Sequence, residues 1–144
     1  MKREITTSQT EVIFGKDDVV VQQFIADIPG GRTIDFTGWA GKDGADIIPA
    51  GTVIIKGTVS GATVYRPHPV ASTTSEGGVT TWSYGTITSG FAVVGVLYRT
   101  ITRSNPQGSI LVAAKLNSEA LPYAMTSAQK TALPTILFVS DEEA

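Results

Sequence analysis

The chain has no cysteine and only one histidine among its 144 residues. The absence of cysteine excludes a disulfide framework and any metal site built on thiolates. No apolar run approaches the 18 or more residues that a membrane-spanning helix requires, so we expect no membrane partner. The N-terminal residues are charged or polar with no apolar segment behind them, which is not the pattern of a secretory signal peptide.

An excess of charge of one sign is also lacking, because eleven basic and thirteen acidic residues leave a formal net charge of −2. Nucleic-acid-binding proteins usually carry a basic patch, so we expect no nucleic-acid partner. The sequence contains no nucleophile elbow, phosphate-binding loop or zinc-binding helix motif. We therefore expect no enzyme, no catalytic residues and no cofactor.

Two weaker candidates for chemistry remain. His68 could act as a general base, since its ordinary pKa lies near 6.5, but a lone histidine between Pro67 and Pro69 is more often a surface residue. Asp43 and Asp46 lie in a glycine-rich loop, yet the alternate ligands and closing glutamate of a calcium-binding loop do not follow them. We expect neither catalysis by His68 nor a metal site.

Glycine, proline and β-branched residues are plentiful, which is typical of an all-β fold with frequent turns. A chain of this length is expected to form one domain that buries roughly 68% of its unfolded surface. We predict a mainly β, compact sandwich or barrel-like domain over residues 15–144. Residues 1–14 are predicted to form a flexible, extended N-terminal arm.

The longest apolar pattern lies in residues 89–117 and predicts two strands, 91–101 and 109–116, joined by a polar turn at 104–108. Period-two alternation in 32–37 predicts a strand that buries Ile34 and Phe36 on one face. Residues 66–78 are expected to form a loop, and Ser60-Gly61 a kink within a strand. Further strands are predicted at 11–14, 19–25, 52–57, 58–65, 79–84 and 135–139.

A short helix is predicted near the C-terminus. Thr126 followed three residues later by Gln129 forms a capping box, and Pro134 ends the helix. The helix should pack through Ala128, Ala132 and Leu133. Residues 117–121 are expected to add one helical turn, so the domain would contain one or two short helices.

Three aromatic residues are candidates for ligand binding. Trp82 and Tyr84 share one face of the strand predicted at 79–84, and with Trp39 they could form a platform for a sugar ring. Packing of these residues in a core or an interface is the favoured interpretation.

The region from Pro49 to the C-terminus, about two-thirds of the chain, resembles the head decoration, or capsid-cementing, proteins of tailed bacteriophages. The resemblance is one of order: an entry strand, a glycine-led central strand, a polar turn, a second apolar strand ending in Asn, a Leu, a short helix and a final Ile-led strand. The residues that carry it are Ala50-Gly51-Thr52-Val53-Ile54, Gly90-Phe91-Ala92-Val93-Val94-Gly95-Val96-Leu97, Val112-Ala113-Ala114-Lys115-Leu116-Asn117, Leu121, 126–133 and Ile136-Leu137-Phe138.

This resemblance implies a viral structural protein that is made in the host cytoplasm and sits on the outer surface of the virion head. There it would bind the major capsid protein as a homotrimer and stabilise the capsid against the pressure of the packaged DNA. A polar arm could attach by adding as a strand to a capsid sheet. The residues predicted to bind the capsid are Ile5, Thr6, Val12, Ile13 and Phe14. The alternative is a receptor- or carbohydrate-binding module of a phage fibre that uses Trp39, Trp82 and Tyr84.

Overall fold

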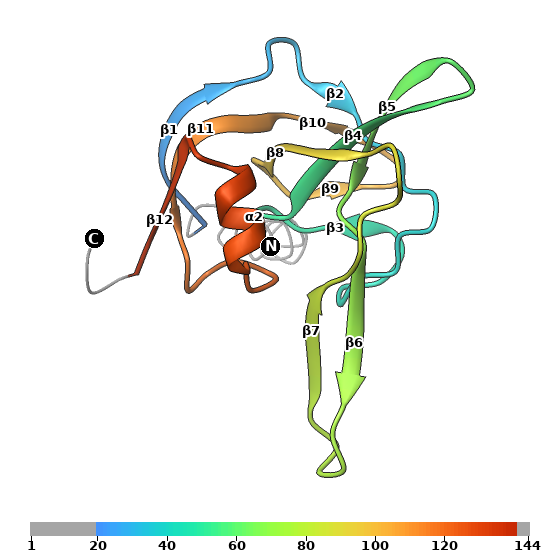
Figure 1. The fold of residues 1–144 in the computed structure, drawn as a ribbon, viewed down its shortest axis with the longest axis vertical. Coiled ribbons are helices and arrows are strands. Elements are labelled where there is room, and N and C mark those ends of the chain that lie inside the picture. The colour runs from blue at the N-terminus through green and yellow to red at the C-terminus, as the bar shows by residue number, and fades with distance from the viewer. Residues whose placement is uncertain (1–19, 141–144) are drawn as a thin grey trace, which may run out of the picture.

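The computed structural model of the chain describes residues 20–140. These residues form several antiparallel sheets and a short helix near the C-terminus, which confirms the prediction of a mainly β fold. Figure 1 shows a rounded β body from which one long hairpin extends.

A six-stranded sheet forms the body of the molecule. Its strands follow the order β1-β11-β8-β4-β5, and β12 pairs in parallel with β11 beside β8. β11 is therefore the central strand, because it contacts β1 along one edge and both β8 and β12 along the other. The strands are β1 (Val21–Asp27), β4 (Val53–Val59), β5 (Ala62–Pro67), β8 (Ala92–Leu97), β11 (Ile110–Asn117) and β12 (Ile136–Val139).

The two long apolar strands predicted within residues 89–117 do pair with each other, but over fewer residues than expected. β8 and β11 pair antiparallel only through Leu97 with Ile110 and Val96 with Leu111. The segment between them is not a simple turn, because it contributes short strands to two small sheets. In these sheets β9 (Ile101–Thr102) pairs with β3 (Ile47–Ile48), and β10 (Gln107–Gly108) pairs with β2 (Arg32–Thr33).

Ser60 and Gly61 form a hairpin turn between β4 and β5, so the predicted kink is wrong. Both residues have positive φ, 50° for Ser60 and 81° for Gly61. Two consecutive residues with positive φ are the signature of the tight turns that match the twist of paired strands. Val59 consequently faces Ala62 across the turn, and the two strands stay paired as far as Ile54 and Pro67.

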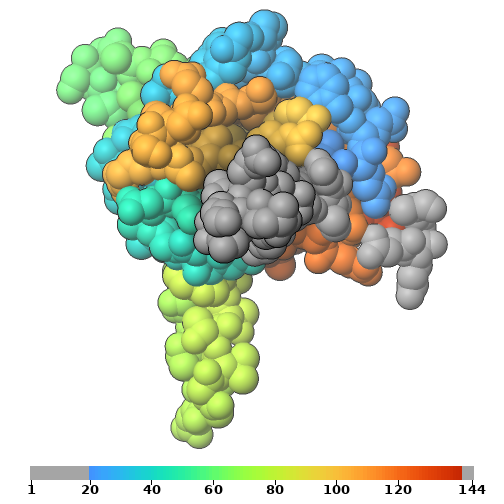
Figure 2. Space-filling view, turned by 180° about the vertical axis from the view of Figure 1, so that it is seen from behind, coloured from blue at the N-terminus to red at the C-terminus, as the bar shows by residue number. Residues whose placement is uncertain are grey.

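The loop predicted over residues 66–78 is also wrong, because most of it is strand. β6 (Val70–Thr74) and β7 (Thr80–Tyr84) pair antiparallel and form a two-stranded sheet of their own. This hairpin, residues 70–84, extends away from the body in both Figure 1 and Figure 2, and we call it the projecting hairpin. The strand predicted at 79–84 is confirmed as β7.

The core consists of two groups of buried apolar residues. The alternation predicted for residues 32–37 is confirmed in burial, since Ile34 and Phe36 are buried and their neighbours are not. The first group lies around these two residues, and the second is formed by residues of β4, β8, β11 and β12 together with the residue that caps the C-terminal end of the helix. Their buried members are Ile34, Phe36, Trp39, Ile48, Ile54, Leu97, Ile101, Ile110 and Tyr123, and Val53, Val96, Leu111, Ala114, Leu116, Leu133 and Ile136.

The predicted helix is α2 (Ser127–Ala132), and its capping box is present. Gln129 Oε1 accepts a hydrogen bond from the Thr126 amide at 2.8 Å. The predicted packing face is largely wrong, because Ala128 and Ala132 are exposed and only Leu133, at the C-cap, is buried. The helical turn predicted at residues 117–121 is not present. These residues form a non-helical turn, and in it the Asn117 side chain accepts a hydrogen bond from the Glu119 amide.

Candidate functional site

Four aromatic residues hold the base of the projecting hairpin against the body. Tyr123 lies at the centre, and its ring centroid is 6.1 Å from that of Trp39, 6.5 Å from that of Trp82 and 5.5 Å from that of Tyr84. We call these four residues the aromatic cluster. Because Trp82 and Tyr84 belong to β7, their packing on Tyr123 fixes the direction in which the hairpin leaves the body.

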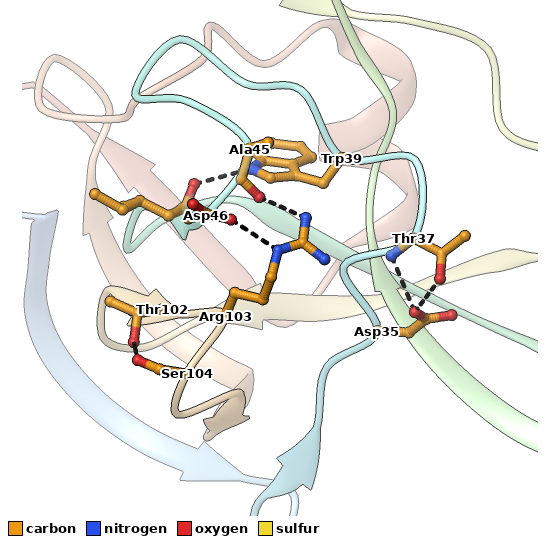
Figure 3. Close-up of polar contacts among 9 residues, drawn as sticks. Asp35, Thr37, Trp39, Ala45, Asp46, Thr102, Arg103 and Ser104 are labelled. Atoms are coloured by element: carbon orange, nitrogen blue, oxygen red, sulfur yellow. Dashed lines mark hydrogen bonds and ion pairs between the residues drawn. The ribbon is translucent and has the colours of Figure 1, made fainter.

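Each polar group that these rings bury has a hydrogen-bond partner. The Trp39 indole donates to the Ile47 carbonyl at 2.8 Å (Figure 3). The Tyr84 hydroxyl accepts from the Val53 amide at 3.0 Å, and the Tyr123 hydroxyl accepts from the Lys42 amide at 3.0 Å. Burial raises the pKa of both tyrosines, and this effect outweighs the hydrogen bonds, which lower the pKa. Both hydroxyls are therefore neutral and structural near neutral pH.

The structure brings Trp39, Trp82 and Tyr84 together, but around Tyr123 rather than on an open surface. Trp39 is only 5% exposed, and Trp82 and Tyr84 are half-buried. This arrangement matches the packing interpretation of these aromatics and presents no flat three-ring platform. Sequence reasoning missed Tyr123, because a single aromatic after a proline carries no periodic signal.

His68 is 1% exposed, so the expectation of a surface histidine is wrong. Its ring lies 4.8 Å from the ring of Tyr84, and its Nδ1–H donates to the Pro69 carbonyl at 2.9 Å. Its backbone amide donates to the Val53 carbonyl. Burial lowers the pKa of His68, against the opposing effect of the hydrogen bond to Pro69. His68 is thus a packing residue between β4 and the base of the hairpin.

Beyond its base, the projecting hairpin is open to solvent. All residues from Ala71 to Thr81 are exposed, and Val79 at the tip is 64% exposed. Residues 70–84 contain one charged side chain, that of Glu76, and are otherwise rich in threonine and serine. An isolated two-stranded hairpin is marginal in water, so contact with a partner would stabilise this element.

A cleft of about 210 Å³ lies beside the base of the hairpin, and we call it the base cleft. Its charged residue is Arg66, whose Nε donates to Asp35 Oδ2 at 2.8 Å and whose guanidinium lies 5.2 Å from the centre of the Phe91 ring. The remaining lining is mostly apolar. The full lining is Thr37, Gly38, Trp39, Ala40, Ile55, Arg66, Pro67, Pro69, Val70, Thr88 and Phe91.

Asp35 completes the ion pair at the base cleft. Burial alone would raise its pKa, but hydrogen bonds from Thr37 and from Arg66 outweigh this effect and hold the pKa below its usual value. Both Thr37 bonds, from the amide and from the hydroxyl, reach Oδ1 (Figure 3). The carboxylate of Asp35 is therefore ionised at neutral pH and holds the Arg66 side chain in place.

Of the two aspartates in the glycine-rich loop, Asp46 has a structural role. Arg103 Nε donates to its Oδ1 at 2.8 Å, and the same guanidinium donates to the Ala45 carbonyl (Figure 3). Within residues 20–140, no three His, Cys, Asp or Glu side chains gather as a metal site would require. In the same residues no helix is long and apolar enough to cross a membrane.

The residues predicted to bind a capsid, Ile5, Thr6, Val12, Ile13 and Phe14, lie outside the described residues, as does the whole predicted arm. The first strand of the described residues is β1, an edge strand of the main sheet, and it exposes Phe24 (46%) and Ile25 (53%). No family model matches the chain, and no curated protein or solved structure matches it.

Proposed function

We propose that this chain is a head decoration protein that binds the outer surface of an assembled phage capsid and stabilises it against internal pressure. The observation that carries the proposal is the order of elements in the C-terminal part of the chain. β8, β11, the turn at Asn117, α2 and β12 occur along the chain in the order of the resemblance to decoration proteins, with the short strands β9 and β10 between β8 and β11 in place of a simple turn. The strands of this series pair as one sheet, so the sequence pattern corresponds to a single packed unit.

The N-terminal arm is the proposed attachment element. It precedes β1, which exposes the apolar side chains of Phe24 and Ile25. An arm that adds as a strand to a capsid sheet gains main-chain hydrogen bonds, at the cost of ordering it on binding. Many copies on one lattice, each a proposed homotrimer, compensate for weak individual contacts through avidity.

The carbohydrate-binding alternative is not favoured by the position of its aromatics. Trp39 has almost no solvent-accessible surface, and the rings of Trp82 and Tyr84 pack against Tyr123. A Trp82→Ala change would therefore disturb the base of the hairpin as well as any ligand contact.

Deletion of residues 1–14 tests the proposal. We expect the truncated chain to remain folded, because the described sheet and both core groups lie within residues 20–140, yet to lose binding to purified heads. Deletion of residues 141–144 serves as the matched control and should leave binding unchanged. Binding is measured by co-sedimentation with heads stripped of this protein, and folding by circular dichroism. Full saturation of heads by the truncated chain would contradict attachment through the arm.

The copy number in virions tests the function itself. Quantitative mass spectrometry of purified particles should give hundreds of copies per head, in fixed proportion to the major capsid protein. A dozen copies would indicate a fibre component instead, and absence from the particle would refute a structural role.

A further inference from the structure

The free edge of the projecting hairpin can be assigned from its hydrogen-bond pattern. The ladder runs without a bulge from Val70 opposite Tyr84 to Thr74 opposite Thr80. At one end the Ser75 amide donates to the Val79 carbonyl, and at the other the Gly85 amide donates to the Pro69 carbonyl. Because bonded and non-bonded pairs alternate along antiparallel strands, the odd-numbered residues of β6 bond inward. Val70, Ser72 and Thr74 therefore direct their amides and carbonyls outward.

Only one of the two hairpin edges is open along its whole length. The β7 edge is partly occupied at its base, where Ser83 forms a parallel bridge with Ala124. In the described part of the chain, β6 pairs with β7 alone, so the outward amides of Ser72 and Thr74 have no acceptor there. The β6 edge is thus a row of unsatisfied backbone groups on an element that is itself short of stabilising contacts.

Two other edge strands of the molecule carry features that hinder strand addition, and β6 does not. β1 is interrupted by three shifts of register along β11. β5 ends in Arg66 and Pro67, a charge and a residue without an amide hydrogen. β6 has no proline, no bulge and no charge. The β6 edge therefore presents no such obstacle to pairing with another strand.

We propose that the β6 edge pairs with the β6 edge of a second copy of this chain, antiparallel about a two-fold axis at Ser72. This register sets Ser72 opposite Ser72 and Val70 opposite Thr74 of the partner copy, so that outward groups meet outward groups. Small and β-branched side chains suit such cross-strand pairs, and no like charges face each other. The product is a four-stranded sheet with the order β7-β6-β6-β7, and it would join copies from two different proposed trimers.

Charge complementarity supports a second copy as the occupant. In the same register, the tip of one hairpin lies alongside residues 66–69 of the other, at the rim of the base cleft. The tip carries the only charge of the hairpin, the Glu76 carboxylate, and the cleft carries the Arg66 guanidinium. Within the described residues Arg66 uses its Nε for Asp35, so its terminal nitrogens remain as donors for a carboxylate. Each copy thus supplies both halves of the contact.

Sedimentation velocity of the full chain over a concentration series tests this pairing. Ser72→Pro removes an outward amide without breaking a ladder bond to β7, and should weaken association about tenfold or more. Ser72→Ala keeps the amide and should change association less than about twofold. Glu76→Lys should weaken association more than Glu76→Gln, with the larger effect at low salt. Tryptophan fluorescence, which reports on Trp39 and Trp82 of the aromatic cluster, verifies that the hairpin base is intact in each variant.

Amide hydrogen exchange provides a second, direct measurement. Protection of Ser72 and Thr74 should increase with protein concentration, while the amide of Thr73, bonded to β7, should change little. The proposal is refuted if Ser72→Pro associates as the unmodified chain does. It is equally refuted if the Ser72 and Thr74 amides stay unprotected at high concentration and become protected only on capsids, since the occupant would then be a capsid strand.

Discussion

The hydroxyl of Tyr84 joins the projecting hairpin to the main sheet through a single hydrogen bond, and Tyr84→Phe should reveal its contribution. The hydroxyl accepts from the amide of Val53, a residue with 0% exposure. Phenylalanine keeps the ring that packs on Tyr123 and His68 but removes this acceptor. The Val53 amide would then be buried without a partner, which costs about 1–3 kcal/mol.

For a chain of this size the same loss corresponds to a fall in Tm of about 3–10 °C. Thermal and urea denaturation followed by circular dichroism measure it. Tyr65→Phe is the matched control, because the Tyr65 hydroxyl has only a long 3.5 Å bond from Arg32 Nε at a half-buried site. The control should cost less than about 0.5 kcal/mol. Equal stability of the two variants would refute the assignment of the Tyr84 hydroxyl as the partner of the Val53 amide.

Two further predictions concern the sheet and the buried histidine. Gly95→Ala should destabilise the fold by about 3 kcal/mol or more in urea denaturation, because the added Cβ would lie 2.3 Å from the Leu111 carbonyl oxygen. Gly77→Ala, at the open hairpin tip, should cost less than about 0.5 kcal/mol; similar losses in both would contradict the close approach. Since the pKa of His68 is lowered on folding, its contribution to stability is fully present above about pH 6.5 and is lost as the pH falls toward the lowered value. The free energy of unfolding measured from pH 8 to pH 5 should therefore fall more steeply than in His68→Gln, and parallel profiles would refute this linkage.

Hydrophobic patterning predicted the elements that have a buried face. β4 and β11 run largely apolar because their faces meet the core, and Ile34 and Phe36 were predicted on one face for a similar reason. The capping box of Thr126 and Gln129 could also be predicted from the sequence, because it is a local interaction between residues three positions apart. Side-chain packing of the same helix was not, since Ala128 and Ala132 do not reach the core.

Long-range packing accounts for the errors at the base of the hairpin. Pro67 and Pro69 suggested a loop because they lack amide hydrogens, yet the amide of His68 between them reaches the Val53 carbonyl in β4. Burial of His68 depends on that bond and on Tyr84, which is distant in sequence. Tyr123 lies at the centre of the aromatic cluster but belongs to no helix or strand, so no hydrophobic periodicity in the sequence identifies it.

β6 was predicted as loop for a different physical reason. Residues 71–74 are exposed on both faces, so burial imposes no alternation on them, and a strand of this kind leaves no hydrophobic pattern in the sequence. The informative feature is the lack of charge in residues 70–84 apart from Glu76. A solvent-exposed hairpin normally tolerates lysine and glutamate, which also protect its edges from other strands. The core does not require this segment to be neutral, whereas pairing of the β6 edge with a second copy would disfavour charges there, because like charges would face each other across the two strands.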